Sequence, residues 1–550
     1  GAAEGSEPTG ARGSNLVAAG IFLSRIAGLI RNVVIGVVLG GSGGVLDAFN
    51  FAMRIPNIMQ NLLGEGSLSA SFIPVYAKLV EDGKEEEADD LAGVVVTLLA
   101  LATAILVLLA VFLARPLVWL LTDWEIDPVK YELTITLTRI TTIGIGFLVI
   151  SAWCLGILNS HRNFFLSYVA PVIWNVTQIA VLVAFAALSW SENDIAVAVA
   201  WAVVAGGFLQ LAVQLPKVRR LAPTVRLNLA RTPSANDVLR RFAPAVGARG
   251  VVQISSYADV FLAGMLVSGA LGWYSLSLPL YLLPIALFGF SVAAAELAEM
   301  SRRSDSAAAI SERLKPALLR VVIPAGFITA AFLVASKPII DALYGWPSRL
   351  FDRGLDDPNK ITVVALILSA FAIGLPATMT ARVTQNTLYS MGDVKGPAKI
   401  AIVRLAVSVT AGLILILQLD WLTFDGNEIV AFDSVPHWPA WERVPEARRV
   451  APDEIPHLGA VGLALSASLA AWVEWFLLRR RLSRRLSGAI TSGWARQIIV
   501  AALGSAAIMF LLTRLGVPSP IDAVLVGLGG LAVYGGLLWL QGVRPSLAGR

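Results

Sequence analysis

The sequence SRIAGLIRNVVIGVVLG at 24–40, followed by DAFNFAMRIPNIMQNLLGEG at 47–66, decides the fold class of this chain. Each stretch has the length of a membrane-crossing helix, because about 20 residues rising 1.5 Å each cross a hydrocarbon core of about 30 Å. Each also carries charged side chains at helical spacing among Ile, Val, Leu, Ala and Phe. The pair therefore predicts two transmembrane helices, each with one polar face turned away from lipid.

The composition extends this prediction to the whole chain. Of 550 residues, 56% are hydrophobic and only 15% are charged, and the mean hydropathy is +0.73. Soluble globular chains are about 45–50% apolar and about 25% charged, so a soluble protein is excluded. The formal charge of +5 lies in connections between apolar runs and does not indicate nucleic acid. Cys154 is the single cysteine, which excludes a disulfide within the chain and a cysteine metal cage.

Apolar runs long enough to span a bilayer follow one another almost from end to end. We expect an all-α integral membrane protein of about fourteen transmembrane helices, with two six-helix lobes around a central cavity and a C-terminal helix pair. A weak repeat supports the two lobes: each half ends in a basic loop, at 217–241 and 479–496, and the second helix of each half contains a proline, Pro56 or Pro284. The expected divisions are a disordered tail at 1–14, an N-lobe at 15–221, a C-lobe at 222–481 with an extracytoplasmic loop at 420–457, and the final pair at 482–550. The expected spans lie near 15–39, 45–64, 91–113, 132–158, 165–189, 195–215, 238–268, 270–298, 316–336, 361–389, 397–419, 458–478, 492–514 and 520–541.

The distribution of Lys and Arg predicts the orientation. Basic residues gather in alternate connections, at 217–241, 302–315, 395–399 and 479–496, whereas the connections at 123–127 and 191–194 are acidic. By the positive-inside rule the basic side is cytoplasmic, which places both termini in the cytoplasm if the number of spans is even. The 420–457 connection is the longest, and we expect a partly ordered cap without catalytic residues there.

Charged residues in the first two spans are the strongest functional candidates, since an ionisable side chain at the bilayer centre costs at least about 2.5–3.5 kcal/mol. The first span contains Arg25 and Arg31. The second has polar residues at steps of three, four, three, four and four, which form one stripe if the helix continues past Pro56. That stripe consists of Asp47, Asn50, Arg54, Asn57, Asn61 and Glu65.

Two interpretations of these charges stay open. They could neutralise one another across the helix pair, for example Arg54 with Asp47. Against this, three arginines face two acids, and the surplus positive charge in a lipid-shielded site favours an anion. A guanidinium group suits phosphate because its planar fork donates bidentate hydrogen bonds.

Other buried charges are ambiguous from sequence. Arg139 in the fourth span either contacts a substrate or pairs with an acid, and Asp259 in the seventh span is either half of an ion pair or a cation ligand. The second-lobe charges Arg382, Arg404 and Glu474 are interpreted as structural or as reaching for the membrane interface. No phosphate-binding loop or catalytic triad is present, and His161, His437 and His457 are scattered, so an ATP-driven pump or a membrane hydrolase is disfavoured.

The two opening helices, with the SLSASFIPVY that follows them, closely resemble the MurJ (MviN) family, the bacterial lipid II flippases of the MOP exporter superfamily. The likeness continues through LGILNSHRNFFLSYVAPVIWN at 155–175, WAVVAGGFLQLAVQLPKV at 201–218 and LYSMGDVKGPAKIAIV at 388–403, and it thins beyond about residue 405. The resemblance implies fourteen helices in the bacterial inner membrane. It also implies alternating access that carries undecaprenyl-pyrophosphate-linked disaccharide-pentapeptide, lipid II, to the outer leaflet.

The resemblance also assigns residues. The family's functional basic and acidic positions in the first two helices match Arg25, Arg31, Asp47, Arg54 and Glu65, and a basic position in the fourth helix matches Arg139. Asn57 joins this substrate-binding set through the stripe of the second helix, and Asp259 matches a position that is acidic or amide in relatives. The chain departs from the family at neutral positions where many members have a charged residue. These positions are Asn32, Gln60, Asn61 and a stretch around Pro279.

The expected function is therefore a lipid II flippase rather than an enzyme. No cofactor is expected, although Na+, H+ or the membrane potential could drive the cycle, with Asp259 as a candidate cation ligand. The expected partners are lipid II and membrane lipids, and contact with cell-wall synthesis proteins is left open. The alternatives are another MOP-type exporter, for a different polyprenyl-linked saccharide or as a cation-coupled antiporter, a polyprenyl-phosphate enzyme, and a scaffold that transports nothing.

Overall fold

The structure is a computed structural model, and it describes residues 11–230, 232–293, 296, 307–425, 428–431, 439–449, 455–486 and 493–543. Some side chains inside these ranges, including those of Glu65 and Arg249, are outside the description. By its contacts the chain divides into two compact units, 1–261 and 262–550. Each unit is described by itself.

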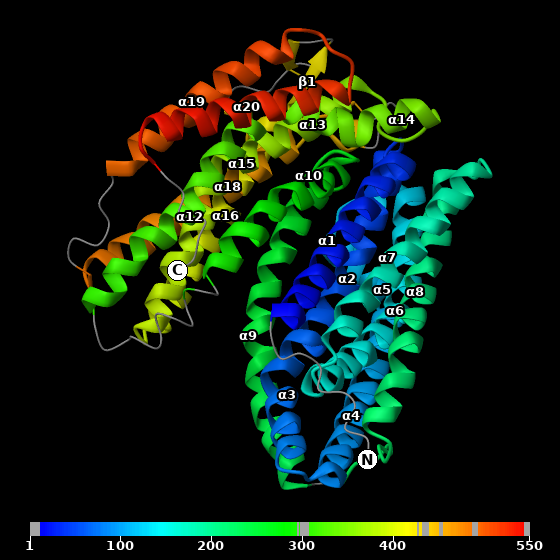
Figure 1. The fold of residues 1–550 in the computed structure, drawn as a ribbon. Helices are drawn as coiled ribbons and strands as arrows, with labels where there is room; N and C mark the ends of the chain where they lie inside the picture. Colours follow the sequence, from blue (N-terminus) through cyan, green and yellow to red (C-terminus); the bar gives the residue numbers. More distant parts are fainter. Residues whose placement is uncertain are drawn as a thin grey trace. The chain divides into compact units, whose positions relative to one another are not determined.

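The first unit is built of helices (Figure 1). Helix α6 is its centre and packs against α2, α4 and α8. The sequence allows close packing there, because a Cβ added at Gly144 on α6 would lie 3.2 Å from the Cα of Val204 on α8. The helices are α1 (Ala11–Leu39), α2 (Gly43–Leu63), α3 (Glu65–Glu81), α4 (Glu85–Phe112), α5 (Ala114–Leu121), the short η1 (Trp124–Ile126), α6 (Pro128–Ser160), α7 (Phe164–Ala187), α8 (Glu192–Leu221) and α9 (Pro233–Gly264).

The second unit has α15 and α18 at its centre (Figure 1). The two helices approach closely at Gly374, whose backbone N–H donates to the Ser468 hydroxyl at 3.0 Å; a Cβ at Gly374 would lie 2.6 Å from the Ser468 Cα. The elements are α10 (Ala270–Pro284), the π-helix η2 (Ile285–Phe290), α12 (Ala307–Val334), α13 (Ser336–Ile340), the π-helix η3 (Asp341–Gly345), α14 (Trp346–Phe351), α15 (Pro358–Ser390), α16 (Lys395–Leu419), strands β1 (Leu422–Asp425) and β2 (Glu428–Ala431), α17 (Glu446–Arg449), α18 (Gly459–Ser483), α19 (Gly493–Thr513) and α20 (Ile521–Leu540).

The all-α membrane architecture is confirmed, but the count of fourteen spans is not. Within the described ranges twelve helices are long and apolar enough to cross a membrane. The two expected spans not among these twelve correspond to α2 and α9. Both are rich in polar residues: α2 alone contains one Asp, one Arg, one Gln and three Asn in 21 residues. Polar residues that mark a functional helix lower its mean hydropathy. Such a helix is then not recognised as a membrane span by length and hydropathy alone.

Two expected boundaries differ from the structure. Helix α1 already begins at Ala11, inside the expected tail of 1–14, and residues 1–10 lie outside the described ranges. The division into units falls after Phe261, not after residue 221. Between these two positions, the connection at 222–235 is fastened to α4 of the first unit.

The described residues of this connection, called here the strap (residues 222–235), make four hydrogen bonds with side chains of α4. Asp89 accepts hydrogen bonds from the backbone N–H and the hydroxyl of Thr224, at 2.9 and 2.6 Å. The backbone N–H of Asn228 donates to the Thr97 hydroxyl at 3.2 Å, and the Ser234 hydroxyl donates to Glu87 at 2.5 Å. A Cβ on Gly93 of α4 would lie 2.1 Å from the Arg226 carbonyl oxygen, so only glycine fits there.

In the long connection at 420–457 the structure describes residues 420–425, 428–431, 439–449 and 455–457. Strands β1 and β2 pair antiparallel, with Leu422 opposite Ala431 and Asp425 opposite Glu428. The side chain of Gln418, near the end of α16, bonds the backbone of Ala440 in both directions, and the Trp421 indole donates to the Glu442 carbonyl at 2.9 Å. These contacts hold the segment 439–449 against the end of α16.

Asp420, at the end of α16, is a buried carboxyl beneath this segment. It is 5% exposed, and its Oδ1 has no hydrogen-bond partner in the described part of the chain. Burial raises the pKa of Asp420 from 3.8 to about 7, although the positive charges of Arg449 and Arg443 act to lower it. His457 bonds the Asp420 carbonyl oxygen through Nδ1, and burial lowers the pKa of this histidine.

The packing of this segment is expected to weaken as pH rises from about 4 to about 7. In that window the folded state keeps the Asp420 proton that the unfolded state has released, so folding stability falls with rising pH. The pKa difference corresponds to about 4 kcal/mol at pH 8. Hydrogen exchange of 439–449 in purified protein at pH 5 and pH 8 measures this loss of stability.

The Asp420→Asn variant should exchange more slowly than wild type at pH 8, because it has no carboxyl to ionise. Faster exchange in the variant would contradict the prediction. Because its pKa is lowered in the folded state, His457 makes folding stability rise with pH below about pH 6.5. Wild type and Asp420→Asn both contain His457, so their comparison at pH 8 is not affected by it.

Candidate functional site

The polar stripe of the second span lies on the accessible side of α2. The helix continues through Pro56 to Leu63, as the stripe requires. Asp47 at its start is buried, Asn50 and Arg54 are half-buried, and Asn57 and Asn61 are exposed. Apolar residues on the other side of α2 are packed inside the unit. The face that this stripe forms is therefore open to a polar ligand along its second half.

The stripe ends where the chain bends at Gly64. A Cβ there would lie 2.4 Å from the Gln60 carbonyl oxygen, so the bend requires glycine. Glu65 begins the next helix, α3, rather than continuing α2. Its side chain lies outside the described residues, and its assignment to the site stays a prediction.

Asp47 forms a buried ion pair with a residue that sequence analysis did not single out. Its Oδ2 lies 2.6 Å from the Lys130 Nζ, and the two side chains are 2% and 4% exposed. The same ammonium lies 3.9 Å from the centre of the Trp124 ring, which itself packs against Phe51 of α2. Lys130 is on the first turn of α6 and joins α6 to α2.

This pair corrects one interpretation of the sequence. The alternative in which the charges neutralise one another gave Arg54, seven residues along the same helix, as an example of a partner for Asp47, whereas the structure pairs Asp47 with Lys130. Lys130 was overlooked because it lies two residues before the expected start of the fourth span, beside the acidic stretch at 123–127. Helix α6 instead starts at Pro128, with Asp127 as its N-cap, and so brings Lys130 into the buried region.

Arg31 of α1 is half-buried, and its guanidinium has no carboxylate partner in the described ranges. Its Nη2 donates to the neutral side chain of Asn32 at 3.0 Å, and its guanidinium carbon lies 4.8 Å from the centre of the Trp174 ring on α7. Its Nε and Nη1 are buried and have no hydrogen-bond partner among the residues described. An unpaired buried charge is costly, so this geometry indicates a place where an anion binds.

Of the three arginines, Arg25 is the most accessible. Arg25 is exposed on α1 and Arg54 is half-buried on α2. Neither has an ion pair with any residue whose side chain the structure describes. The expected surplus of positive charge on these two helices is thus present: Asp47 is engaged by Lys130, and the three arginines remain.

Arg139 lies elsewhere. Thr141 of α6 donates to the Ala52 carbonyl of α2, which marks the face of α6 that packs on α2. Arg139 is two residues earlier, about 200° around the helix, and its exposed side chain donates through Nε to the Val111 carbonyl at 3.3 Å. The structure does not bring Arg139 to the stripe of α2.

Asp259 on α9 is half-buried and has interactions of its own. Within the described residues no three His, Cys, Asp or Glu side chains gather to hold a metal ion. A role for Asp259 as a cation ligand stays a prediction.

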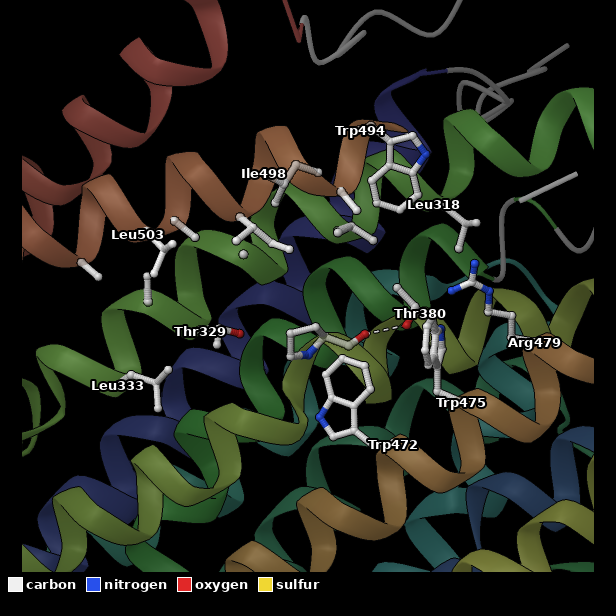
Figure 2. A pocket seen from close by; sticks show the side chains of 18 of the residues that line it. Leu318, Thr329, Leu333, Thr380, Trp472, Trp475, Arg479, Trp494, Ile498 and Leu503 are labelled. Carbon is white, nitrogen blue, oxygen red and sulfur yellow. Dashed lines mark hydrogen bonds between the residues drawn. The ribbon is translucent and has the colours of Figure 1, made fainter. Parts of the chain in front are cut away.

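The second unit contains an apolar cavity of about 460 Å³ between α12, α15, α18 and α19. Figure 2 shows Trp472, Trp475 and Arg479 of α18 and Trp494 of α19 around it. Arg479 lies toward the end near Trp494, with its guanidinium carbon 5.2 Å from the centre of the Trp475 ring. Four helices of membrane-spanning length form this cavity, so it suits an apolar chain rather than a polar solute.

Comparison with known proteins decides the family. The family model described as lipid II flippase MurJ matches residues 38–425, which is more than half of the chain. The chain belongs to the MurJ family. Its resemblance to MurJ, first based on the two opening helices, is thereby confirmed.

Individual relatives agree with this result. The chain is 29% identical to the lipid II flippase MurJ of Burkholderia cenocepacia, over 95% of this chain and 96% of that protein. It is 30% identical to the probable lipid II flippase MurJ of Rhizobium meliloti, over 82% of this chain and 84% of that protein. Among solved structures it is similar to a MurJ in an inward closed conformation, with a TM-score of 0.72, 20% identity, and coverage of 96% of this chain and 100% of that one. An inward-facing MATE transporter of the MOP superfamily shares the fold, with a TM-score of 0.60, 16% identity, and coverage of 86% of this chain and 100% of that one.

Proposed function

We propose that this chain is a lipid II flippase of the inner membrane. It moves undecaprenyl-pyrophosphate-linked disaccharide-pentapeptide from the cytoplasmic to the outer leaflet by alternating access. The observation that carries the proposal, beside membership of the MurJ family, is Arg31. Two of its guanidinium nitrogens are buried without a hydrogen-bond partner in the described structure, and its neighbours there are an amide and an indole ring. A diphosphate supplies the negative charge and the acceptor oxygens that this group lacks.

The rest of the cargo is assigned by its chemistry. Arg54, Asn57 and Asn61 lie along the accessible part of α2 and can bond the diphosphate and the sugar hydroxyls. The apolar cavity of the second unit, lined by Trp472 and Leu503 among others, can take part of the polyprenyl chain. Arg25 lies exposed on α1, where a long flexible side chain can meet the headgroup on entry.

The positive residues also connect transport to the membrane potential. Moving one charge through 100 mV is worth about 2.3 kcal/mol, so a net charge carried with the cargo gives direction to the cycle. Basic connections such as 479–485 support a cytoplasmic position of both termini under the positive-inside rule, provided that the number of spans is even. Coupling to Na+ or H+ remains a prediction, as does contact with cell-wall synthesis proteins.

Replacement of a depleted native lipid II flippase by this chain tests the proposal. We expect growth and normal cell shape to be restored, because an essential cell-wall precursor would again reach the outer leaflet. Purified protein should also carry undecaprenyl-diphosphate-linked cargo in a native mass spectrum. Protein that reaches the membrane in normal amounts, yet neither restores growth nor retains such a lipid, would contradict the proposed function.

A further inference from the structure

Helix α15 of the second unit has two chemically different faces. Pro376, Thr380 and Thr384 line the apolar cavity, and Figure 2 shows Thr380 there. Arg382 lies two residues from Thr380 and from Thr384, about 200° around the helix from each. It belongs to an opposite polar face at steps of four, three and four, which consists of Thr378, Arg382, Gln385 and Tyr389. The second face repeats the spacing of the stripe on α2.

Arg382 on this face is a partly buried guanidinium with neutral contacts. Its Nη1 donates to the Gln385 side-chain oxygen at 3.2 Å, and its guanidinium carbon lies 5.3 Å from the centre of the Phe290 ring. Its Nε is buried and finds no hydrogen-bond partner in the ranges described. An arginine has five N–H groups to place, so most of its donor capacity here is available to a ligand.

The nearby charges leave this face positive. Glu474 of α18 is 5% exposed and lies 2.7 Å from Arg404 of α16. Arg382 interacts electrostatically with both of these residues. Two guanidinium groups thus share one carboxylate, and α10 and η2, on the Phe290 side, contain no charged residue. Arg404 and Glu474 form an ion pair. Arg382, which the sequence grouped with them as structural or as reaching for the membrane interface, is left without a carboxylate of its own in the described structure.

Neutral groups on the same face hold Arg382 in place. The Gln385 side-chain nitrogen donates to the Tyr389 hydroxyl at 2.7 Å, which fixes the amide so that its oxygen faces Arg382. The hydroxyl groups of Tyr281 and Thr378 are 3.0 Å apart on the adjoining part of the face. The π-helix that presents Phe290 is a backbone form found often at functional sites.

We propose that Arg382, with Gln385 and Tyr281 beside it, forms a second oxyanion subsite that binds the diphosphate of the lipid-linked cargo within the second unit. This inference rests on the proposed function and adds a binding residue to it. Guanidinium, amide and hydroxyl groups around one unmet positive charge are the chemistry that recognises phosphate oxygens. They do not suit a cation.

Ligand binding to purified full-length protein in lipid nanodiscs tests the subsite. The probes are undecaprenyl diphosphate and the uncharged alcohol undecaprenol. The Arg382→Gln variant should bind the diphosphate about tenfold or more weakly than wild type, since a charge-assisted hydrogen bond is lost. Undecaprenol binding should not change. The Arg382→Lys variant keeps the charge but loses the planar guanidinium. Its affinity for undecaprenyl diphosphate should lie between those of wild type and Arg382→Gln.

The matched control is Arg514→Gln, which removes an exposed guanidinium lying 4.8 Å from the centre of the Phe510 ring. This variant should bind both probes like wild type. Unchanged diphosphate affinity in Arg382→Gln, or equal losses for the diphosphate and the alcohol, would overturn the subsite. If wild type itself shows no preference for the diphosphate over undecaprenol, the proposed function fails, which is a different result from failure of Arg382 alone. Should Arg382→Gln not fold, Arg382→Lys decides through the same comparison.

Discussion

The Lys130→Met variant is expected to lose about 3–5 kcal/mol of folding stability, because it removes the ammonium that pairs with the buried carboxylate of Asp47. The loss should include the contact of the ammonium with the Trp124 ring. Thermal unfolding of detergent-purified protein, followed by tryptophan fluorescence, measures the change. The double variant Asp47→Asn with Lys130→Met removes both charges and should recover most of the stability.

The chain provides a matched control for this experiment. Arg115 and Glu132 form an ion pair of the same 2.6 Å length, but their side chains are 53% and 56% exposed. Arg115→Gln should leave the unfolding temperature unchanged, because an exposed pair contributes little. If Lys130→Met were as stable as wild type, or no less stable than the double variant, the pair would have no role in holding α6 to α2.

The Arg31→Met variant is expected to lose transport while keeping or gaining stability. Removing a buried charge that lacks a counter-charge relieves a cost, so the unfolding temperature should stay equal or rise. Binding of the diphosphate cargo should weaken about 10- to 100-fold, the value of one strong charge-assisted hydrogen bond. Growth support in the replacement assay should be lost although the protein reaches the membrane in normal amounts.

The direction of the stability change separates a binding role from a structural one. If Arg31 were held by a structural contact with Trp174, its loss would lower the unfolding temperature together with transport. Arg54→Gln should behave like Arg31→Met in transport, since Arg54 has no ion-pair partner among the described side chains. Arg115→Gln is again the control. Full transport by both Arg31→Met and Arg54→Gln would exclude the stripe and α1 as the place where the diphosphate binds.

Most of the fold could be predicted because membrane helices are recognisable in a sequence by the length and hydropathy of their apolar runs. The long apolar runs, such as the one that became α4, could not be anything else. What escaped were features that depend on tertiary contacts. The sequence of 65–81 lacks a long apolar run and was not expected to form a separate helix, yet α3 starts directly after the Gly64 bend. Hydropathy also does not reveal that the strap bonds α4.

The candidate site was predictable in its parts and not in its pairings. Helical spacing correctly placed Arg54 and Asn57 on one accessible face of α2. Spacing within one helix could not identify Lys130 as the partner of Asp47, because that contact joins residues 83 positions apart. It also could not show that Arg139 points away from α2. A polar face can therefore be predicted from the spacing of residues in one helix. The role of a single charged residue can be assigned only when the packing of the neighbouring helices is known.

The fastening of the strap determines how this polypeptide tolerates division into two coexpressed fragments. A break after residue 221 puts Thr224 and Asn228 on one fragment and their acceptors on α4, Asp89 and Thr97, on the other. The two fragments could still form these hydrogen bonds on association. Before association, however, the first fragment would expose the surface of α4 around Gly93, which the strap covers. A break after Gly264, where α9 ends, leaves the strap with α4 in a single fragment. A break after Gly264 is therefore the better position for split reporters and for segmental isotope labelling of this molecule.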